Sequence, residues 1–193
     1  MRRMRPGCLV ADFRLESERL VLRSWREEDL APFHAICADR QVMATLGPVL
    51  DRAQTATLIE RLRALEALDG HTFWALERSE DARFIGLCGV IRGTDGPVTG
   101  KAEIGWRLAS DCWGQGYASE AARAAVDWLF ANLEDDAAWA ITHTGNTRSR
   151  AVMERLRMHY HPELDFPHPK LAAGDLLRPH VVYSLERSNW LEA

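Results

Sequence analysis

The stretch "AEIGWRLASDCWGQGYASEAARAAVDWLF", Ala102 to Phe130, sets the fold because two different periodicities meet in it across a glycine turn. Its first part, Ala102 to Ala109, alternates apolar and polar residues, which predicts a half-buried strand. Its last part predicts an amphipathic helix, since apolar residues recur every three or four positions. These positions are Ala118, Ala121, Ala122, Ala125, Val126, Leu129 and Phe130. Gly114 and Gly116 fall between the two elements, so the stretch is a strand, a glycine turn and a helix.

Further strands and helices are predicted on both sides of this unit. Asp51 and Gln54 form a pattern typical of a capping box, which begins a helix that runs to Leu68 and ends near Gly70. The other expected elements are strands at 19–25, 71–78, 84–92, 138–144 and 180–187, and helices at 26–38 and 147–158. Three consecutive strands joined by short turns indicate an antiparallel meander. The sequence therefore predicts a mixed α/β fold.

Length and composition indicate one globular domain. The chain has 193 residues, of which 47% are hydrophobic and 27% charged. This is enough for one sizeable core. We expect residues 1–14 to form an N-terminal extension and residues 15–193 a single domain.

Charge, cysteines and hydropathy limit the partners. A formal net charge of -4 argues against nucleic acid as the primary partner. Cys8, Cys37, Cys88 and Cys112 form no CxxC pair, so we expect reduced thiols and no metal. No apolar run reaches about 18 residues, which predicts a cytoplasmic protein with no membrane partner. The pattern does not fix the oligomeric state and leaves a homodimer open.

The glycine turn is suited to an anion. Backbone N–H groups at a helix N-terminus attract phosphate, and glycines allow it to approach closely. A Walker A loop is excluded because no Gly-Lys-Ser/Thr follows, and a dinucleotide fingerprint is weak because Ser119 replaces its third glycine. The turn could also need glycine only for a positive φ. The turn alone leaves these alternatives open.

The rest of the chain resembles a known family. The stretch above, followed by "NTRSRAVMERLRM", a final "HVVYSLER" and an initial "ERLVLRSWREEDL", is similar to the GNAT superfamily of acetyl-CoA-dependent N-acetyltransferases, most closely its RimJ/RimL type. The likeness covers about residues 15–187. It implies the GNAT fold, a mostly antiparallel twisted sheet flanked by helices with strands that splay apart at the coenzyme A site.

The resemblance also implies the site for acetyl-CoA. The family's turn holds the coenzyme A pyrophosphate through backbone amides, and Gly116 and Ala118 match the last two positions of its motif. Asn146 and Ser149 match an Asn-x-x-Ser in the next helix, which lies near the pantetheine arm and the thioester. The expected cofactor-binding residues are Ile104, Trp106, Leu108, Trp113, Gly114, Gln115, Gly116, Tyr117, Ala118, Asn146 and Ser149.

Two catalytic residues are expected. Glu103 matches a Glu that relatives use as general base through a water, although it could be an ordinary solvent-facing strand residue. Ser149 could pass a proton to the thiolate, or it could be a simple surface hydroxyl. Asn146 is also suited to be the N-cap of the helix that begins at Thr147. The implied reaction transfers the acetyl group of acetyl-CoA to a primary amine, either a protein N-terminal amino group or a small molecule.

Three departures from the family motif matter. Trp113 replaces the usual Gln/Arg, which changes little if backbone N–H groups do the binding. Arg157 stands where a Gly usually ends the helix, and a left-handed non-glycine residue there costs about 1 kcal/mol. Met153 stands where many relatives place a Tyr that protonates the thiolate. The alternative function is therefore a non-catalytic acyl-CoA-binding module. Residues 159–180, rich in His and Pro, are expected to form a lid loop rather than a metal site.

Overall fold

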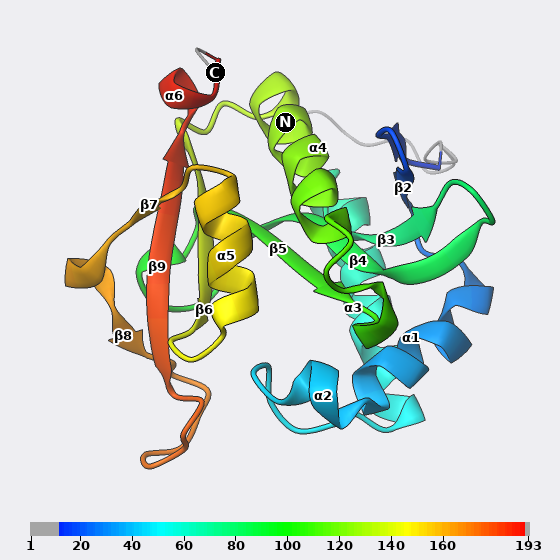
Figure 1. Ribbon diagram of the computed structural model, residues 1–193, viewed down its shortest axis with the longest axis horizontal. Helices are drawn as coiled ribbons and strands as arrows, with labels where there is room; N and C mark the ends of the chain where they lie inside the picture. The colour runs from blue at the N-terminus through cyan, green and yellow to red at the C-terminus, as the bar shows by residue number, and fades with distance from the viewer. Residues whose placement is uncertain (1–11, 192–193) are drawn as a thin grey trace, which may run out of the picture.

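The computed structural model describes residues 12–191, and its helices cover both faces of one sheet (Figure 1). The strands are β1 (Arg14–Glu16), β2 (Leu20–Arg23), β3 (Phe73–Arg78), β4 (Arg83–Arg92), β5 (Ala102–Leu108), β6 (Ala137–His143), β7 (His159–Tyr160), β8 (Phe166–Pro167) and β9 (Pro179–Glu186). The α-helices are α1 (Leu30–Ala38), α2 (Arg40–Met43), α3 (Arg52–Asp69), α4 (Tyr117–Asn132), α5 (Thr147–Arg155) and α6 (Arg187–Leu191). Short 3-10 helices are η1 (Glu27–Asp29), η2 (Gly96–Val98), η3 (Ser110–Cys112) and η4 (Pro162–Leu164).

The sheet has the order β1-β2-β3-β4-β5-β6-β9-β7, with β8 also paired to β9. Neighbours from β1 to β5 are antiparallel, and the three consecutive strands β3, β4 and β5 confirm the predicted meander. β5 and β6 are parallel, because α4 carries the chain back across the sheet between them. The last long strand, β9, lies antiparallel to β6 from Ala137 to His143. The predicted mixed α/β, mostly antiparallel sheet is confirmed.

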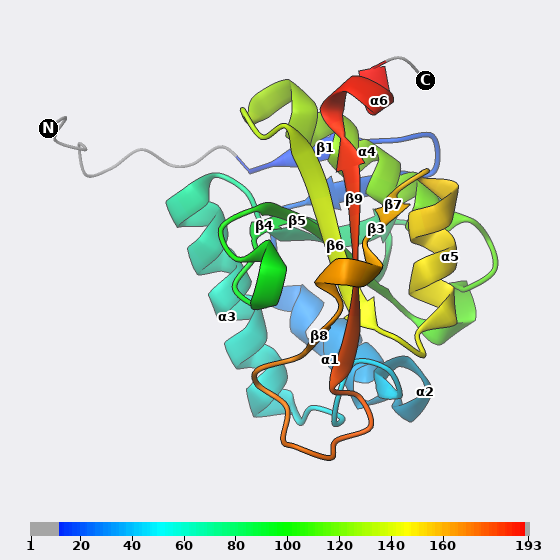
Figure 2. The ribbon, with the colours of Figure 1, turned by 90° about the vertical axis from the view of Figure 1, so that its left-hand side faces the viewer.

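Two hydrophobic cores form, one on each face of the sheet. The first lies under α4 and α5 and includes Leu20, Trp74, Ile104, Leu129 and Met153. The second lies under α1 and α3 and is built around Trp25, Phe33, Ile59 and Phe84. Figure 2 shows α3 and α5 on opposite sides of the sheet, seen nearly along its edge. β3 and β4 serve both cores, since successive side chains along a strand point to opposite faces: Trp74 and Val90 belong to the first core, and Ala75 and Leu87 belong to the second.

Helix ends follow their capping residues. Asp51 and Gln54 form the predicted capping box at the start of α3, with side-chain to backbone bonds of 2.8 and 2.9 Å. Gly70 ends α3 in the left-handed conformation, with φ 77. Both features were predicted from the sequence.

The N-terminal end of the domain begins slightly earlier than expected. Residues 1–11 of the expected extension lie outside the described residues. Phe13 stacks on Trp74 with ring centroids 3.9 Å apart, and Arg14 begins β1. The fold therefore already includes Phe13 and Arg14.

Candidate active site

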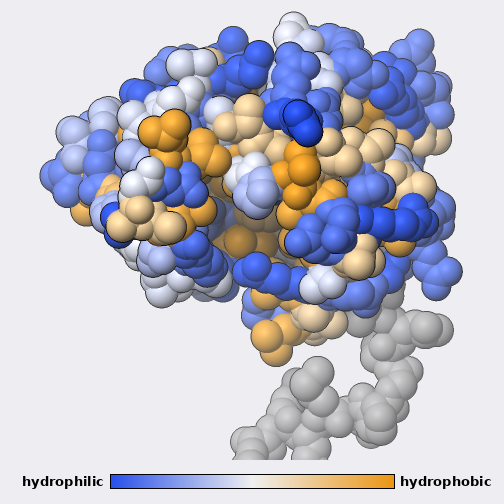
Figure 3. All heavy atoms as spheres, turned by 90° about the horizontal axis from the view of Figure 1, so that it is seen from below, coloured by the Kyte–Doolittle hydropathy of each residue, from blue (hydrophilic) through white to orange (hydrophobic). Residues whose placement is uncertain are grey.

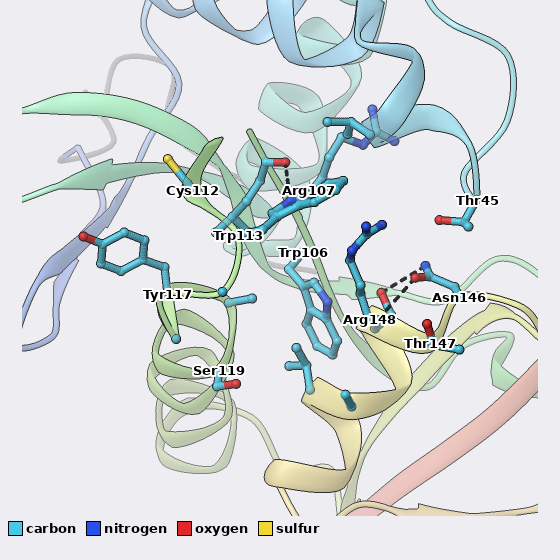
Figure 4. A pocket seen from close by; sticks show the side chains of 18 of the residues that line it. Thr45, Trp106, Arg107, Cys112, Trp113, Tyr117, Ser119, Asn146, Thr147 and Arg148 are labelled. Atoms are coloured by element: carbon cyan, nitrogen blue, oxygen red, sulfur yellow. Dashed lines mark hydrogen bonds between the residues drawn. The ribbon is translucent and has the colours of Figure 1, made fainter. Parts of the chain in front are cut away.

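A pocket of about 640 Å³ lies where the end of β5, the N-terminal ends of α4 and α5, and α2 meet. Figure 4 shows Trp106, Trp113, Asn146 and Arg148 around it, and Thr45 facing it from the α2 side. Figure 3 shows a hollow with hydrophobic atoms at its base on the face where α2 and the lower end of α5 lie. Its lining is Gln41, Val42, Thr45, Leu46, Trp106, Arg107, Leu108, Cys112, Trp113, Gly114, Gly116, Tyr117, Ala118, Ser119, Asn146, Thr147, Arg148, Ser149, Ala151, Val152 and Arg155.

One wall of the pocket is a strand edge without a neighbouring strand. β5 and β6 pair only at Glu103 opposite Trp139 and then separate, so the predicted splay is confirmed. Ala109 donates to β4, whereas the Leu108 carbonyl accepts a bond from the Trp113 indole. Because backbone groups alternate in direction along a strand, those of Trp106 and Leu108 point to the open side. This edge can bind an extended ligand as an added strand would be bound.

The glycine turn forms the second wall. Gly114 and Gly116 have φ values of 75 and 84, and Gly116 is the N-cap of α4. L-residues with side chains rarely adopt this conformation, so the turn requires glycine at both positions. The first N–H groups of α4 have no acceptor within the helix, and they face the pocket with the positive end of the helix dipole.

Arg19 and Glu120 hold the turn in place. Glu120 Oε1 accepts bonds from the Arg19 backbone N–H and from Ser17, at 2.7 and 2.8 Å. The Arg19 guanidinium lies 2.7 Å from Glu120 Oε2 and also donates to the carbonyl of Gln115 at 3.2 Å. The pKa of Glu120 is lowered, since these bonds to its carboxylate outweigh its partial burial. The start of the chain therefore stabilises a turn almost a hundred residues away.

The charged side chains that line the pocket are all basic. Arg107, Arg148 and Arg155 line it, and the lining contains no aspartate or glutamate. The Arg148 guanidinium lies 4.2 Å from the centre of the Trp113 ring. The pocket is therefore positively charged although the whole chain has a net charge of -4. Such a pocket favours a ligand with several negative charges.

Asn146 organises the third wall. Its Oδ1 accepts the Ser149 backbone N–H at 3.2 Å, so the predicted N-cap of α5 is confirmed. Its Nδ2 donates to Thr142 Oγ1 at 2.9 Å and to Ser149 Oγ at 3.1 Å. Both amide hydrogens are therefore used within the protein, and Oδ1 keeps one lone pair for a ligand. Ser149 Oγ accepts from Asn146, so its own hydrogen is available to donate.

Glu103 lies at the point where β5 and β6 part. Ile104 and Leu108 belong to the core under α4 and α5, so Glu103, Gly105 and Arg107 point to the opposite face. Burial raises the pKa of the Glu103 carboxyl to about 7; the charge of Asp95 raises it further and the ammonium of Lys170 opposes both. A carboxyl group with this pKa is about half ionised at neutral pH, as a general base requires.

The His- and Pro-rich segment packs beside Glu103 and is partly regular, with η4 and β8, where a loop was expected. Lys170 Nζ lies 2.8 Å from Asp95 Oδ2. A Cβ on Gly96 would be 2.4 Å from the Phe166 ring, so this ring packs directly on η2. Among residues 12–191 no group of three or more His, Cys, Asp or Glu side chains could hold a metal ion.

Most of the expected site residues meet in this pocket, and three do not line it. Ile104 is a buried core residue, and Glu103 lies at the point where β5 and β6 part, outside the pocket lining. The Gln115 side chain donates to the Asp111 carbonyl at 3.1 Å. The remaining expected residues, Trp106, Leu108, Trp113, Gly114, Gly116, Tyr117, Ala118, Asn146 and Ser149, all line the pocket.

Sequence reasoning missed the residues that come from outside the motifs. Gln41 and Thr45 reach the pocket from the α2 side, and Arg107 reaches it from β5. No local pattern marks Gln41 or Thr45. Arg107 had a signal, because an arginine in a largely apolar strand needs a partner, but the sequence does not show whether it has one.

Two of the three departures from the family motif, Arg157 and Met153, have clear structural outcomes. Arg157 adopts φ 59, and the helix ends with bonds of Arg157 to Glu154 and Met158 to Met153, at 2.9 and 3.0 Å. This is the arrangement that glycine normally provides, kept with an arginine. Met153 is buried in the core and does not line the pocket.

Comparison with protein families decides between the possible anionic ligands. Residues 19–159 match the model described as "Acetyltransferase (GNAT) domain". The chain belongs to the GNAT acetyltransferase family. As a GNAT protein it is an acetyl-CoA-dependent acyltransferase, and its basic pocket has the charge that coenzyme A phosphates require.

Relatives in Bacillus are consistent with the GNAT assignment. The chain is 32% identical to uncharacterized protein YkkB of Bacillus subtilis over 151 residues, covering 78% of this chain and 87% of that protein. It is 28% identical to the uncharacterized N-acetyltransferase p20 of Bacillus licheniformis over 144 residues, covering 74% and 80%. Each alignment covers most of this chain and most of the relative it matches.

Solved structures share the GNAT fold. An acetyltransferase from Agrobacterium tumefaciens superposes with a TM-score of 0.74 and 26% identity, covering 95% of this chain and all of that one. RimL, described as a ribosomal L7/L12 alpha-N-protein acetyltransferase in complex with coenzyme A, has a TM-score of 0.74 at 16% identity, covering 92% and 99%. The likeness to RimL is one of fold.

No helix in the described part of the chain has the length and apolar character needed to cross a membrane.

Proposed function

We propose that this protein transfers the acetyl group of acetyl-CoA to a primary amine by direct attack within a ternary complex. The observation that carries the proposal is the pocket itself: an arginine-lined cavity with no carboxylate, closed on one side by the unpaired edge of β5 and on another by the N-terminus of α4. Phosphates fit the helix end and the two arginines of α5, Arg148 and Arg155. An amide-rich pantetheine arm fits the strand edge.

The residues then divide the chemistry among them. Backbone N–H groups of Trp106 and Leu108 polarise the thioester carbonyl, which becomes an oxyanion when the amine attacks. The attack forms the new N–C bond, and collapse of the oxyanion then breaks the C–S bond and releases the thiolate. Glu103, through a water, accepts the proton that the amine loses. Ser149, whose hydrogen is left available by Asn146, donates to the departing thiolate.

The pKa of the acceptor amine sets the free-energy cost of the deprotonation that Glu103 must assist. An α-amino group with a pKa of about 8 is deprotonated at pH 7 at a cost of about 1 kcal/mol, whereas a lysine amine with a pKa of about 10.4 costs about 5 kcal/mol. An α-amino group is therefore the easier acceptor. The pKa of Glu103, about 7, lies close to the α-amino pKa of about 8, so proton transfer between the two groups costs little.

Thiol release is the test of the proposed reaction. Acetyl-CoA is incubated with the protein and N-terminal peptides, lysine peptides, polyamines, aminoglycosides or free amino acids, and free coenzyme A is measured. Acetylated product with at least one amine supports acetyl transfer. Tight binding of acetyl-CoA with no product from any of these amines would instead support a non-catalytic acyl-CoA-binding module.

A further inference from the structure

Arg107 is the one strand arginine in the region from β1 to β5 that no carboxylate neutralises. The other arginines on these strands are paired with Asp or Glu at 2.6 to 2.8 Å: Arg14 with Glu16, Arg23 with Asp29 and Glu77, Arg78 with Asp81, Arg83 with Asp111, and Arg92 with Asp135. Within residues 12–191, no carboxylate oxygen lies within 4.0 Å of the Arg107 guanidinium. Its position in the pocket wall therefore leaves a charge without a partner.

The contacts that Arg107 does make hold it in place without cancelling its charge. Nη1 donates to Cys37 Sγ at 3.2 Å, and the guanidinium lies 5.9 Å from the centre of the Phe33 ring. Burial raises the pKa of Cys37, so this thiol stays neutral at pH 7. A thiol and an aromatic face fix the direction of the side chain, but they use few of its five N–H donors.

Arg107 is placed differently from the two arginines suited to coenzyme A phosphates. Arg148 and Arg155 come from α5, and Arg148 lies over Trp113 beside the glycine turn. Arg107 points to the opposite face of β5, toward α1 and the side of the pocket that Gln41 and Thr45 line. In Figure 4 the Arg107 side chain extends toward the helices of the α1 and α2 region, on the far side from α4.

Arg107 shares its face of β5 with Glu103. The two lie four residues apart, about 13 Å along a strand. Gly105 lies between them, and the Phe73 ring covers it, since a Cβ there would be 2.7 Å from Phe73 Cζ. An amine that attacks the thioester held at Trp106 lies between these two side chains, next to the Phe73 ring, and can place a second group at Arg107.

We propose that Arg107 binds a carboxylate of the acceptor, so that the acceptor is a free amino acid or a similar small amine carrying a carboxylate. This inference rests on the proposed acetyl transfer and names its acceptor class. A guanidinium matches a carboxylate through two parallel hydrogen bonds. Gln41 and Thr45 line the same part of the pocket and supply neutral donors beside it.

The test compares each amino acid with its own carboxamide, which keeps the amine and side chain and loses only the negative charge. The wild type should acetylate at least one amino acid with a kcat/KM well above that of its amide. Arg107→Gln should lower kcat/KM for the acid on the order of 10²-fold, as expected for loss of a charged hydrogen-bonded pair, and leave the amide nearly unchanged. Arg92→Gln, which removes a guanidinium from the adjacent strand, should change neither.

Several results would overturn the inference. One is an equal loss with acid and amide in Arg107→Gln, and another is a wild type that prefers amides, polyamines or uncharged peptides. A third is a rise, in Arg107→Gln, of the KM for acetyl-CoA but not of the KM for acetyl-pantetheine, which would assign Arg107 to the coenzyme A phosphates.

The folding control is thermal stabilisation by coenzyme A. A stabilisation of Arg107→Gln equal to that of the wild type would show that the variant is folded.

A binding measurement separates this inference from the proposed reaction. The same acid and amide pairs are titrated by calorimetry into the wild type and Arg107→Gln, each loaded with coenzyme A. Binding that prefers the acid and is lost in Arg107→Gln supports the carboxylate site even if no acetyl transfer is found, in which case only the proposed reaction fails. Turnover without any preference for a carboxylate would keep the reaction and overturn this inference.

Discussion

The side of the site proposed to bind acetyl-CoA, the donor side, and the side proposed to bind the amine, the acceptor side, are built in different ways. On the donor side, the glycine turn and the ends of α4 and α5 form a wall of local backbone geometry, braced by Glu120 and Asn146. On the acceptor side, the wall comes from short, separate pieces: the four-residue helix α2, η2, and the two-residue strand β8. One of its links, Lys170 to Asp95, joins a side chain that is 59% exposed to one that is 14% exposed.

This difference shows how the two substrates can be recognised. We propose that main-chain groups hold the phosphate-bearing donor, because such groups tolerate changes of side chain such as Trp113. We propose that side chains brought from distant parts of the chain select the acceptor, and these can change without disturbing the donor wall. Experiments that disturb one side and leave the other unaffected test this division.

The largest effect is expected at Gly116 on the donor side. A valine there must take a left-handed φ of 84, and its Cβ would lie 3.4 Å from Arg19 Nη2, which braces the turn. We expect Gly116→Val to lose thermal stabilisation by coenzyme A completely. The measurement is the shift in melting temperature with increasing coenzyme A.

Gly70→Val is the matched control, because Gly70 has φ 77 with open space around it and lies at the end of α3, away from the pocket. Both variants should unfold more easily, by about 1–2 kcal/mol, from the backbone conformation alone. Only Gly116→Val should stop responding to coenzyme A. A folded Gly116→Val protein with wild-type affinity would contradict the role of the turn.

The next largest effect is expected at Glu103. Glu103→Gln keeps the shape of the side chain and removes the base, so kcat/KM should fall about 10²- to 10⁴-fold while acetyl-CoA binding remains. The loss should shrink at high pH, where the amine arrives already neutral, and it should be larger for a lysine amine than for an α-amino group. A wild-type pH–rate profile in this variant would show that Glu103 is only a strand residue.

The same variant should change how stability depends on pH. The folded-state pKa of Glu103 is about 7, above the unfolded value of 4.5, so the folded wild type holds this proton more tightly than the unfolded chain. Its stability should therefore fall as pH rises from about 4.5 to 7. Chemical denaturation at pH 5 and pH 8 should show a smaller fall for Glu103→Gln, and an identical fall would contradict the raised pKa.

Smaller effects of opposite sign are expected from the two charges next to Glu103. Asp95 raises the pKa of Glu103 and Lys170 lowers it. Asp95→Asn should therefore move the acidic limb of the kcat/KM profile to lower pH, and Lys170→Met should move it to higher pH. The part of the kcat/KM–pH profile that reports the amine pKa should not shift. A shift of the acidic limb in the same direction in both variants would refute this arrangement of charges.

The smallest effect concerns the end of α5. Arg157→Gly places glycine in the left-handed conformation that Arg157 now adopts, so the free energy of unfolding should rise by about 0.5–1 kcal/mol. Ala82→Gly is the control, because Ala82 also has a positive φ, 53, in the turn between β3 and β4. Both should gain stability without a change in kcat/KM. A loss of activity in Arg157→Gly alone would give Arg157 a functional role.

The elements that local patterns define were predictable from the sequence. The alternation in β5, the capping box at Asp51 and the glycine turn each depend on neighbouring residues. Asn146 was expected as an N-cap for the same reason. These features give the meander, the splayed strand and the donor wall.

The acceptor wall could not be predicted in this way. Gln41 and Thr45 follow α1 in a segment without clear periodicity, and they reach the pocket only through the packing of α1 on α3 and β4. The contact of Arg107 with Cys37 joins residues 70 positions apart. The brace from Arg19 to Glu120 joins residues 101 positions apart, and neither end carries a motif.

The position of β9 in the sheet has a consequence for the order of assembly. Strands β1 to β5 pair in the order in which they occur in the sequence, so this half can fold from contacts that close early during synthesis. β6 lies beside β5 at only one position and is otherwise paired with β9, which ends at Glu186. A nascent chain therefore has a glycine turn and α4 before it has a stable platform under α5. Competence to bind coenzyme A should appear only after the last long strand has left the ribosome.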